Sequence, residues 1–233
     1  GAAKRIGKQI AKEFFAIDFN IIVHFNSSSE DAISLCNELN AIRPNSAISI
    51  QANLDHMSDV KNLASQAMSA FGRIDGLINN ASTFYPTPMG EFSEKDWDAL
   101  MGSNLKAPLF LVQELHEELK KQSGFVINIT DINIKRPIKN HSIYLAAKSG
   151  LDTLTKSLAK DLAPEIRVNA IAPGAILEPP NKIWTDSEKN NILSAVPLKK
   201  MGTEIDIAKA AIFLAESPYI TGQTLNIDGG KSL

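Results

Sequence analysis

Short apolar runs rich in β-branched residues alternate with longer amphipathic stretches along the whole chain. Such runs, bounded by turn residues, are typical of buried strands, and apolar positions three or four apart are typical of helices. Their alternation predicts one doubly wound α/β domain of the Rossmann type with a mostly parallel sheet, spanning residues 1–233. Strands are expected at 20–25, 47–51, 76–80, 125–130, 167–171 and 223–227, and helices at 5–15, 29–40, 58–71, 93–122, 142–163 and 203–215.

Three segments stand out from this pattern. Pro108 lies inside the helical pattern at 93–122, where it is expected to kink or break the helix. Residues 173–197 contain several prolines and no clear periodicity of apolar positions, which predicts a substrate loop or lid. Trp184 in this loop either shields the substrate or anchors the loop. Gly1 opens a phosphate-loop-like turn, and we expect a strand upstream of it that completes the sheet.

Composition narrows the function classes. The chain has 233 residues, 44% of them hydrophobic, and a net charge of -2, so it can build a sizeable core and lacks the basic surface of a nucleic-acid-binding protein. The single cysteine, Cys36, suits a reducing, cytoplasmic setting. No apolar run approaches the roughly 20 residues of a membrane span. The four histidines lack ligand spacing with Cys36 or the carboxylates, so no metal site is expected.

Candidate chemistry gathers where strands end and helices begin. Gly1 and Gly7 precede an apolar helical pattern, which suits a helix N-terminus aimed at phosphate. Tyr144 and Lys148 lie four residues apart on a predicted helix, where the ammonium can stabilise a phenolate. Asp131, at the end of the preceding strand, either joins this pair or caps the following turn.

The order of these motifs resembles the short-chain dehydrogenase/reductase family over the whole chain. The matching pieces are the loop from Gly1 to Gly7, Asn79-Asn80-Ala81, Asn104, Tyr144 with Lys148, Pro173-Gly174 and Asp228-Gly229-Gly230. The resemblance implies that Tyr144 is the proton donor, that Lys148 binds the nicotinamide ribose and assists Tyr144, and that Asn104 helps to hold a water-linked proton relay. It also implies a homotetramer. Independently of the resemblance, the predicted helices at 93–122 and 142–163 carry apolar residues on more than one face, which favours association. In the second helix, the small residues Ala146, Ala147 and Gly150 are expected to leave a smooth strip on which another helix can pack.

Two departures from the general family pattern look like pteridine reductases. Asp131 stands where the family has a serine, thirteen residues before Tyr144, and Arg5 replaces the middle glycine of the loop. The stretch from Asn79 to Pro88 is also similar to that subfamily. By this resemblance Phe84 stacks on a pterin, although Phe84 and Tyr85 can also simply pack under a loop. The expected substrate-binding residues are Arg5, Ser82, Phe84, Asp131 and Tyr144, and the expected catalytic residues are Asp131, Tyr144, Lys148 and Asn104.

The end of the strand at 20–25 favours NADPH. NAD-selecting enzymes place an acid there for the ribose hydroxyls, but this chain has His24-Phe25-Asn26-Ser27-Ser28. The resembling pteridine reductases often carry arginine where Ser27 stands, and Asn53 replaces a common aspartate. The expected cofactor-binding residues are Gly1, Lys4, Arg5, Ile6, His24, Phe25, Asn26, Ser27, Asn53, Leu54, Asn80, Ala81, Ser82, Tyr144, Lys148, Pro173 and Gly174.

These residues predict an NADPH-dependent reductase of a pterin or folate. A flat polar heterocycle needs an aromatic face and rim donors and acceptors, which Phe84, Arg5, Ser82 and Asp131 can supply. One alternative is a carbonyl reductase of the same family that acts on a 3-oxoacyl or sugar substrate, for which Asp131 and Phe84 are incidental. Another is a non-catalytic dinucleotide-binding protein, which the presence of Tyr144, Lys148 and Asn104 together disfavours.

Overall fold

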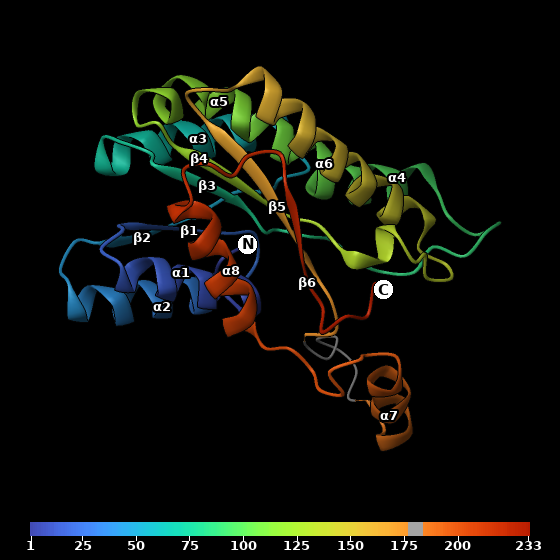
Figure 1. The fold of residues 1–233 in the computed structure, drawn as a ribbon. Coiled ribbons are helices and arrows are strands. Elements are labelled where there is room, and N and C mark those ends of the chain that lie inside the picture. Colours follow the sequence, from blue (N-terminus) through green and yellow to red (C-terminus); the bar gives the residue numbers. More distant parts are fainter. Residues whose placement is uncertain (177–183) are drawn as a thin grey trace.

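The computed structural model describes residues 1–176 and 184–233, and its helices cover both sides of a parallel sheet (Figure 1). This is the α/β architecture expected from the sequence, and most element boundaries fall within two residues of the predicted ones. The strands are β1 (Ile21–Phe25), β2 (Ala47–Gln51), β3 (Gly76–Asn79), β4 (Phe125–Ile129), β5 (Arg167–Pro173) and β6 (Thr224–Ile227). The α-helices are α1 (Arg5–Ala16), α2 (Ser29–Ile42), α3 (Met57–Phe71), α4 (Glu94–Met101), α5 (Ala107–Lys121), α6 (Ser142–Asp161), α7 (Asp186–Ser194) and α8 (Glu204–Glu216).

The sheet consists of two hydrogen-bonded parts. β1 pairs with β2, and β3, β4, β5 and β6 follow one another in that order, all in parallel. Between β1 and β3 lies a cavity of about 520 Å³ with mostly apolar walls, to which Ile22 and Leu77 contribute from opposite sides. The strand expected upstream of Gly1 stays a prediction.

Side chains on β4 alternate between two apolar layers. Phe125, Ile127 and Ile129 pack with α1, α2 and α8, whereas Val126 packs with α3 and α5 on the other face. Cys36 is buried in the first layer, as its apolar surroundings in the sequence indicate. Because both faces are covered, the polar carboxyl ends of the strands and the loops after them are left to form a site.

The expected single helix at 93–122 is three segments. α4 begins with a capping box between Ser93 and Asp96, a π-helical segment follows at Gly102–Lys106, and α5 then runs to Lys121. The helix is interrupted next to Pro108, as expected: Pro108 lies in the first turn of α5, and the irregular turn precedes it. A π-turn widens the helix before the proline, which has no N–H to bond the carbonyl four residues earlier, that of Asn104.

The expected unstructured loop at 173–197 contains a helix. α7 begins after Thr185, whose side chain forms a capping box with Glu188. The prediction of a loop was therefore wrong for 186–194. Trp184 is half-buried, and Pro179, Pro180 and Asn181 lie outside the described residues.

The small residues of α6 pack within the chain. Ala147 is fully buried, and a Cβ on Gly150 would lie 3.0 Å from the Leu105 side chain of the π-segment. The expectation that both belong to a strip for another subunit was wrong, because α6 packs directly on α4 and the π-segment. Ala146 alone of the three is exposed. Among the described helices, none is long and apolar enough to cross a membrane.

Candidate functional site

Tyr144 and Asp131 are joined directly. Tyr144 lies in the first turn of α6, is 5% exposed, and donates a hydrogen bond from Oη to Asp131 Oδ2 at 2.8 Å. The other carboxylate oxygen of Asp131 accepts the Asn133 N–H at 2.7 Å and caps the short 3₁₀ turn after β4. Asp131 therefore both caps the turn and contacts the tyrosine.

The surroundings of Tyr144 keep its proton in place. Burial is the largest cause that raises the pKa of Tyr144 far above its ordinary value, and the charge and hydrogen bond of Asp131 raise it further. The polar Ser82 side chain acts in the opposite direction and lowers the pKa. At neutral pH Tyr144 is therefore a neutral hydroxyl with a proton to give.

Lys148 lies one helical turn beyond Tyr144 and is buried completely, at 2% exposure. Its Nζ donates to the carbonyl of Ile129 at 2.8 Å and lies 5.9 Å from the centroid of the Tyr144 ring. Burial lowers the pKa of Lys148 to about 8, while the charge of Asp131 acts to raise it. The ammonium is thus aimed at the carboxyl end of β4, beside the tyrosine.

A buried polar chain fixes α6 against the sheet. Asn79 Nδ2 on β3 donates to Asn128 Oδ1 on β4 at 2.8 Å, and Asn128 Nδ2 donates to Thr155 Oγ1 on α6 at 2.9 Å. All three side chains are at most 6% exposed. Because buried polar groups need their partners, this chain sets the position of the helix that carries Tyr144.

The π-segment anchors the loop after β3. Asn104 accepts from Ser82 Oγ at 2.8 Å and donates from Nδ2 to the carbonyls of Thr83 (2.8 Å) and Leu100 (2.9 Å). The neighbouring Ser103 hydroxyl donates to Thr83 Oγ1 at 2.8 Å. Asn104 thus holds the loop that carries Ser82 and Thr83.

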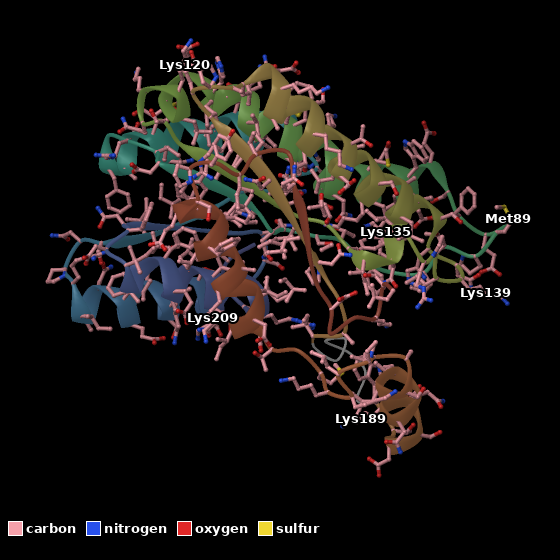
Figure 2. All side chains as sticks on the ribbon, in the orientation of Figure 1. Met89, Lys120, Lys135, Lys139, Lys189 and Lys209 are labelled. Carbon is pink, nitrogen blue, oxygen red and sulfur yellow. The ribbon has the colours of Figure 1, made fainter. Side chains whose placement is uncertain are left out.

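Phe84 forms an aromatic wall beside Tyr144. Its ring meets the Tyr144 ring edge-on at 4.8 Å between centroids, stacks on His141 at 4.7 Å, and is 49% exposed. The loops that carry Phe84 and His141 are tied by the Thr87 N–H, which donates to the Asn140 carbonyl at 2.6 Å. Figure 2 shows Met89 and Lys139, from these two loops, at the same outer edge of the molecule. Tyr85 turns away to donate to Asp96 at 3.1 Å.

Sequence reasoning missed His141 as a member of this cluster. It considered the histidines only as metal ligands, although His141 precedes Tyr144 by three residues at the start of the same helix, a spacing that places both on one face. Across the described ranges, no group of histidine, cysteine and acidic side chains could hold a metal ion.

Many of the expected cofactor residues line a second cavity of about 210 Å³. Three residues that were not expected there, Asp55, Thr83 and Ser103, contribute as well. Their positions in the sequence could have indicated this role, because Asp55 follows the end of β2 and the other two are next to Ser82 and Asn104. The expected residues in this wall are Gly1, His24, Asn26, Asn53, Leu54, Ala81 and Ser82.

The backbone around this cavity fits a dinucleotide. A Cβ on Gly7 would lie 2.1 Å from the Gly1 carbonyl oxygen and 2.6 Å from Asn80 Nδ2, so only glycine permits this close approach. α1 begins at Arg5 without a side-chain cap or an acidic residue in its first turn, which leaves its N–H groups for a phosphate. Asn80 Nδ2 donates to the Gly1 carbonyl and fixes the loop to β3.

Other expected cofactor residues are placed differently. Lys4 forms an ion pair with Asp31 of α2 at 2.8 Å, Ile6 and Phe25 are half-buried against the core, and Ser27 is exposed. Gly174 contacts β6, where its N–H donates to Ile227, and a Cβ there would lie 2.5 Å from Asp228 Cα. Arg5 is exposed with φ 53°, a left-handed conformation that is uncommon outside glycine.

His24 is a neutral wall residue. Burial lowers its pKa to about 4, and its Nε2 atom lies 3.0 Å from the Ala52 carbonyl oxygen. A positive charge for a ribose phosphate must therefore come from another residue.

Comparison with known proteins places this site in a family. A family model described as enoyl-(acyl carrier protein) reductase matches residues 1–232. The 3-oxoacyl-[acyl-carrier-protein] reductase FabG of Staphylococcus epidermidis is 34% identical over 234 residues, which cover 99% of this chain and 96% of that protein. Pteridine reductase 1 of Leishmania tarentolae is 33% identical over 275 residues, which cover 100% and 94%.

The two kinds of relative are similar to this chain to the same degree. The expected greater similarity to pteridine reductases is therefore not specifically supported, and the substrate has to be argued from individual residues. The family itself is shown by matches that span nearly the whole chain. The chain belongs to the short-chain dehydrogenase/reductase family of oxidoreductases.

Proposed function

We propose that this oxidoreductase uses NADPH to reduce a pterin or folate. The observation that carries the proposal is the half-exposed Phe84 ring beside the hydrogen-bonded pair of Tyr144 and Asp131. An aromatic face next to a proton donor and a carboxylate suits a flat heterocycle with polar edges. Arg5, exposed at the start of α1, would contact the same substrate.

The side chains of this site have distinct roles in the reduction of a C=N bond. Bound NADPH supplies the hydride, which goes to carbon. Tyr144 gives its proton to nitrogen, and Phe84 holds the ring plane against the cofactor. Lys148 binds the ribose and favours the phenolate form of Tyr144, and Asn104 keeps Ser82 in place. Asp131 contacts both the tyrosine and the substrate.

The cavity near the end of β1 supports NADPH over NADH. No carboxylate lies at His24, Phe25, Asn26 or Ser27, the positions at the end of β1 where NAD-selecting enzymes place an acid. Since His24 is neutral, the positive charge for the ribose phosphate of NADPH would come from Lys4 or Arg5 at the start of α1.

A 3-oxoacyl reductase is the second candidate. It is favoured by the 34% identity to the Staphylococcus epidermidis FabG protein, which is named for that activity. In this case Tyr144 would protonate a carbonyl oxygen, and Phe84 and Asp131 would be incidental to the reaction.

A direct comparison of substrates tests the proposal. NADPH oxidation is followed with dihydrobiopterin, dihydrofolate and a β-keto ester, each with wild type, Tyr144→Phe and Asp131→Ser. We expect turnover of a pterin or folate but not of the ester, and loss of about a hundred- to ten-thousandfold in Tyr144→Phe. Asp131→Ser, which restores the usual family residue, should slow pterin reduction more than it weakens cofactor binding. Faster turnover of the ester than of any pterin would favour the second candidate.

We also propose a cytoplasmic homotetramer. Large apolar side chains are exposed on two separate elements: Trp97 on α4 is 49% exposed, and Phe213 and Ile205 on α8 are 53% and 45% exposed. Two different apolar faces suit the two kinds of two-fold interface in a tetramer. The single buried Cys36 suits a reducing compartment.

A further inference from the structure

We propose that His141 is a positioning residue for the substrate: its imidazole ring lies against Phe84 and holds this phenylalanine in the orientation that receives the flat substrate ring. The inference rests on the proposed function, in which the substrate stacks on Phe84. His141 takes no part in the proton transfer and acts through Phe84.

Phe84 needs such support because of where it lies. The described loop between β3 and α4 contains no helix or strand, and the Phe84 side chain is 49% exposed. A half-exposed ring on a loop samples several rotamers unless a neighbour restricts it. Freezing these rotamers when a ligand binds costs free energy, so a ring that is already restricted binds a flat substrate more tightly.

Two aromatic rings restrict Phe84. The Tyr144 ring meets it at 79° with centroids 4.8 Å apart, whereas the His141 ring is nearly parallel to it, at 18° and 4.7 Å. Both separations lie within the range of favourable aromatic pairs. A parallel ring covers only one face of Phe84, and the exposed remainder is available to the substrate. Because Tyr144 is engaged with Asp131, His141 is the support that can be altered without disturbing the proton donor.

The His141 ring is itself held from two sides. The backbone carbonyl of His141 accepts the Leu145 N–H at 2.9 Å, which places the residue at the start of α6. Its Nδ1 atom lies 2.7 Å from the Lys139 carbonyl oxygen, which can only accept, so Nδ1 carries a proton and donates it there. The adjacent Asn140 carbonyl accepts the Thr87 N–H at 2.6 Å. His141 is thus joined to α6 and, through its neighbour, to the loop after β3, so it can set one against the other.

Kinetic constants for three variants separate the ring from the hydrogen bond. His141→Ala should raise the KM for dihydrobiopterin or dihydrofolate about two- to tenfold, the worth of one aromatic pair, and leave kcat and the KM for NADPH within about twofold. His141→Tyr keeps a ring and should restore the KM. His141→Asn keeps a donor for the Lys139 carbonyl but has no ring, so it should behave like the alanine variant; asparagine also suits a helix start, should the alanine variant fold poorly.

A double variant distinguishes action through Phe84 from direct contact with the substrate. In a Phe84→Ala background, His141→Ala should raise the substrate KM no further, because the ring through which it acts is gone. His56→Ala is the matched control, since His56 precedes α3 as His141 precedes α6, likewise without a side-chain cap. It should leave the substrate KM unchanged.

The orientation of Phe84 can also be observed without substrate. The chain has 10 phenylalanines, so labelling with para-fluorophenylalanine gives a small set of ¹⁹F signals, and Phe84→Leu assigns the signal of Phe84. His141→Ala should narrow this signal and move it toward that of a solvent-exposed ring, because the stacked neighbour is lost. In His141→Tyr and His56→Ala the signal should stay as broad as in wild type.

Four results would overturn the role of His141. They are an unmoved Phe84 signal in His141→Ala, a substrate KM that His141→Tyr does not restore, a further rise in KM when His141→Ala is added to Phe84→Ala, and an effect of equal size in His56→Ala. A wild-type enzyme that reduces no pterin or folate would instead contradict the proposed function. The ¹⁹F signals do not depend on turnover, so they would still show whether His141 holds Phe84.

Discussion

Replacing Lys148 by methionine should make the cofactor-free protein more stable while abolishing activity. The ammonium is fully buried, and its pKa falls from 10.5 to about 8. At about 1.4 kcal/mol per pKa unit, keeping this charge in the folded protein at pH 7 costs roughly 3 kcal/mol. Methionine has a similar length and no charge, but it loses the hydrogen bond to the Ile129 carbonyl, worth about 1 kcal/mol.

The expected net gain is about 2 kcal/mol at pH 7, or a rise in Tm of about 4–8 °C for a domain of this size. Its pH dependence has a definite sign. Between pH 8 and 10.5 the unfolded chain binds more protons at Lys148 than the folded chain does, so wild type gains stability as the pH rises through this window. The advantage of the variant should therefore vanish by about pH 10.

Urea unfolding followed by circular dichroism, at pH 7 and pH 10 and without cofactor, measures both values. Lys156→Met is the matched control: Lys156 lies on the same helix, is 58% exposed and pairs with Asp152 at 2.6 Å. It should change the free energy of unfolding by less than about 1 kcal/mol at either pH. A Lys148→Met protein that is less stable than wild type by the same amount at both pH values would refute the reasoning.

Three further predictions concern the cofactor loop and assembly. Arg5→Gly should raise the free energy of unfolding by about 1 kcal/mol, because φ 53° suits glycine, and yet weaken NADPH and pterin binding; lower stability in urea unfolding would contradict this. Gly7→Ala should weaken NADPH binding at least tenfold in a fluorescence titration, because the added Cβ would lie 2.1 Å from the Gly1 carbonyl oxygen. Wild-type affinity in this variant would show that the loop between Gly1 and Gly7 is not held in this conformation. Sedimentation at low micromolar concentration should show a tetramer that Trp97→Lys weakens, whereas a single 25.3 kDa species in wild type would exclude the assembly.

The strands and the tyrosine helix were predictable because their signals are local. A buried strand needs a continuous apolar run, and the spacing of Tyr144 and Lys148 fixes their common face whatever surrounds them. The meeting of Asp131 with Tyr144 follows from the same logic, since carboxyl ends of parallel strands open on one edge of the sheet.

Other features depend on information that periodicity does not contain. α7 buries none of its residues, so it has no apolar period, and only the capping box from Thr185 to Glu188 marks it in the sequence. The stacking of Phe84 on His141 requires two loops to meet, which depends on the hydrogen bond between Thr87 and Asn140. The position of the π-segment was missed because a helix with one wider turn keeps apolar residues at nearly the same intervals.

The π-segment at Gly102–Lys106 makes the site sensitive to the length of the chain as well as to its composition. Deleting one residue there would allow α4 and α5 to join as a regular helix, with every residue of α4 rotated by about 100° relative to α5. The amide of Asn104 and the hydroxyl of Ser103 would no longer face the loop after β3 together. In a lineage of such proteins, a single insertion or deletion in this helix would thus separate members with an anchored loop from members without one, even where each residue of the catalytic cluster is retained.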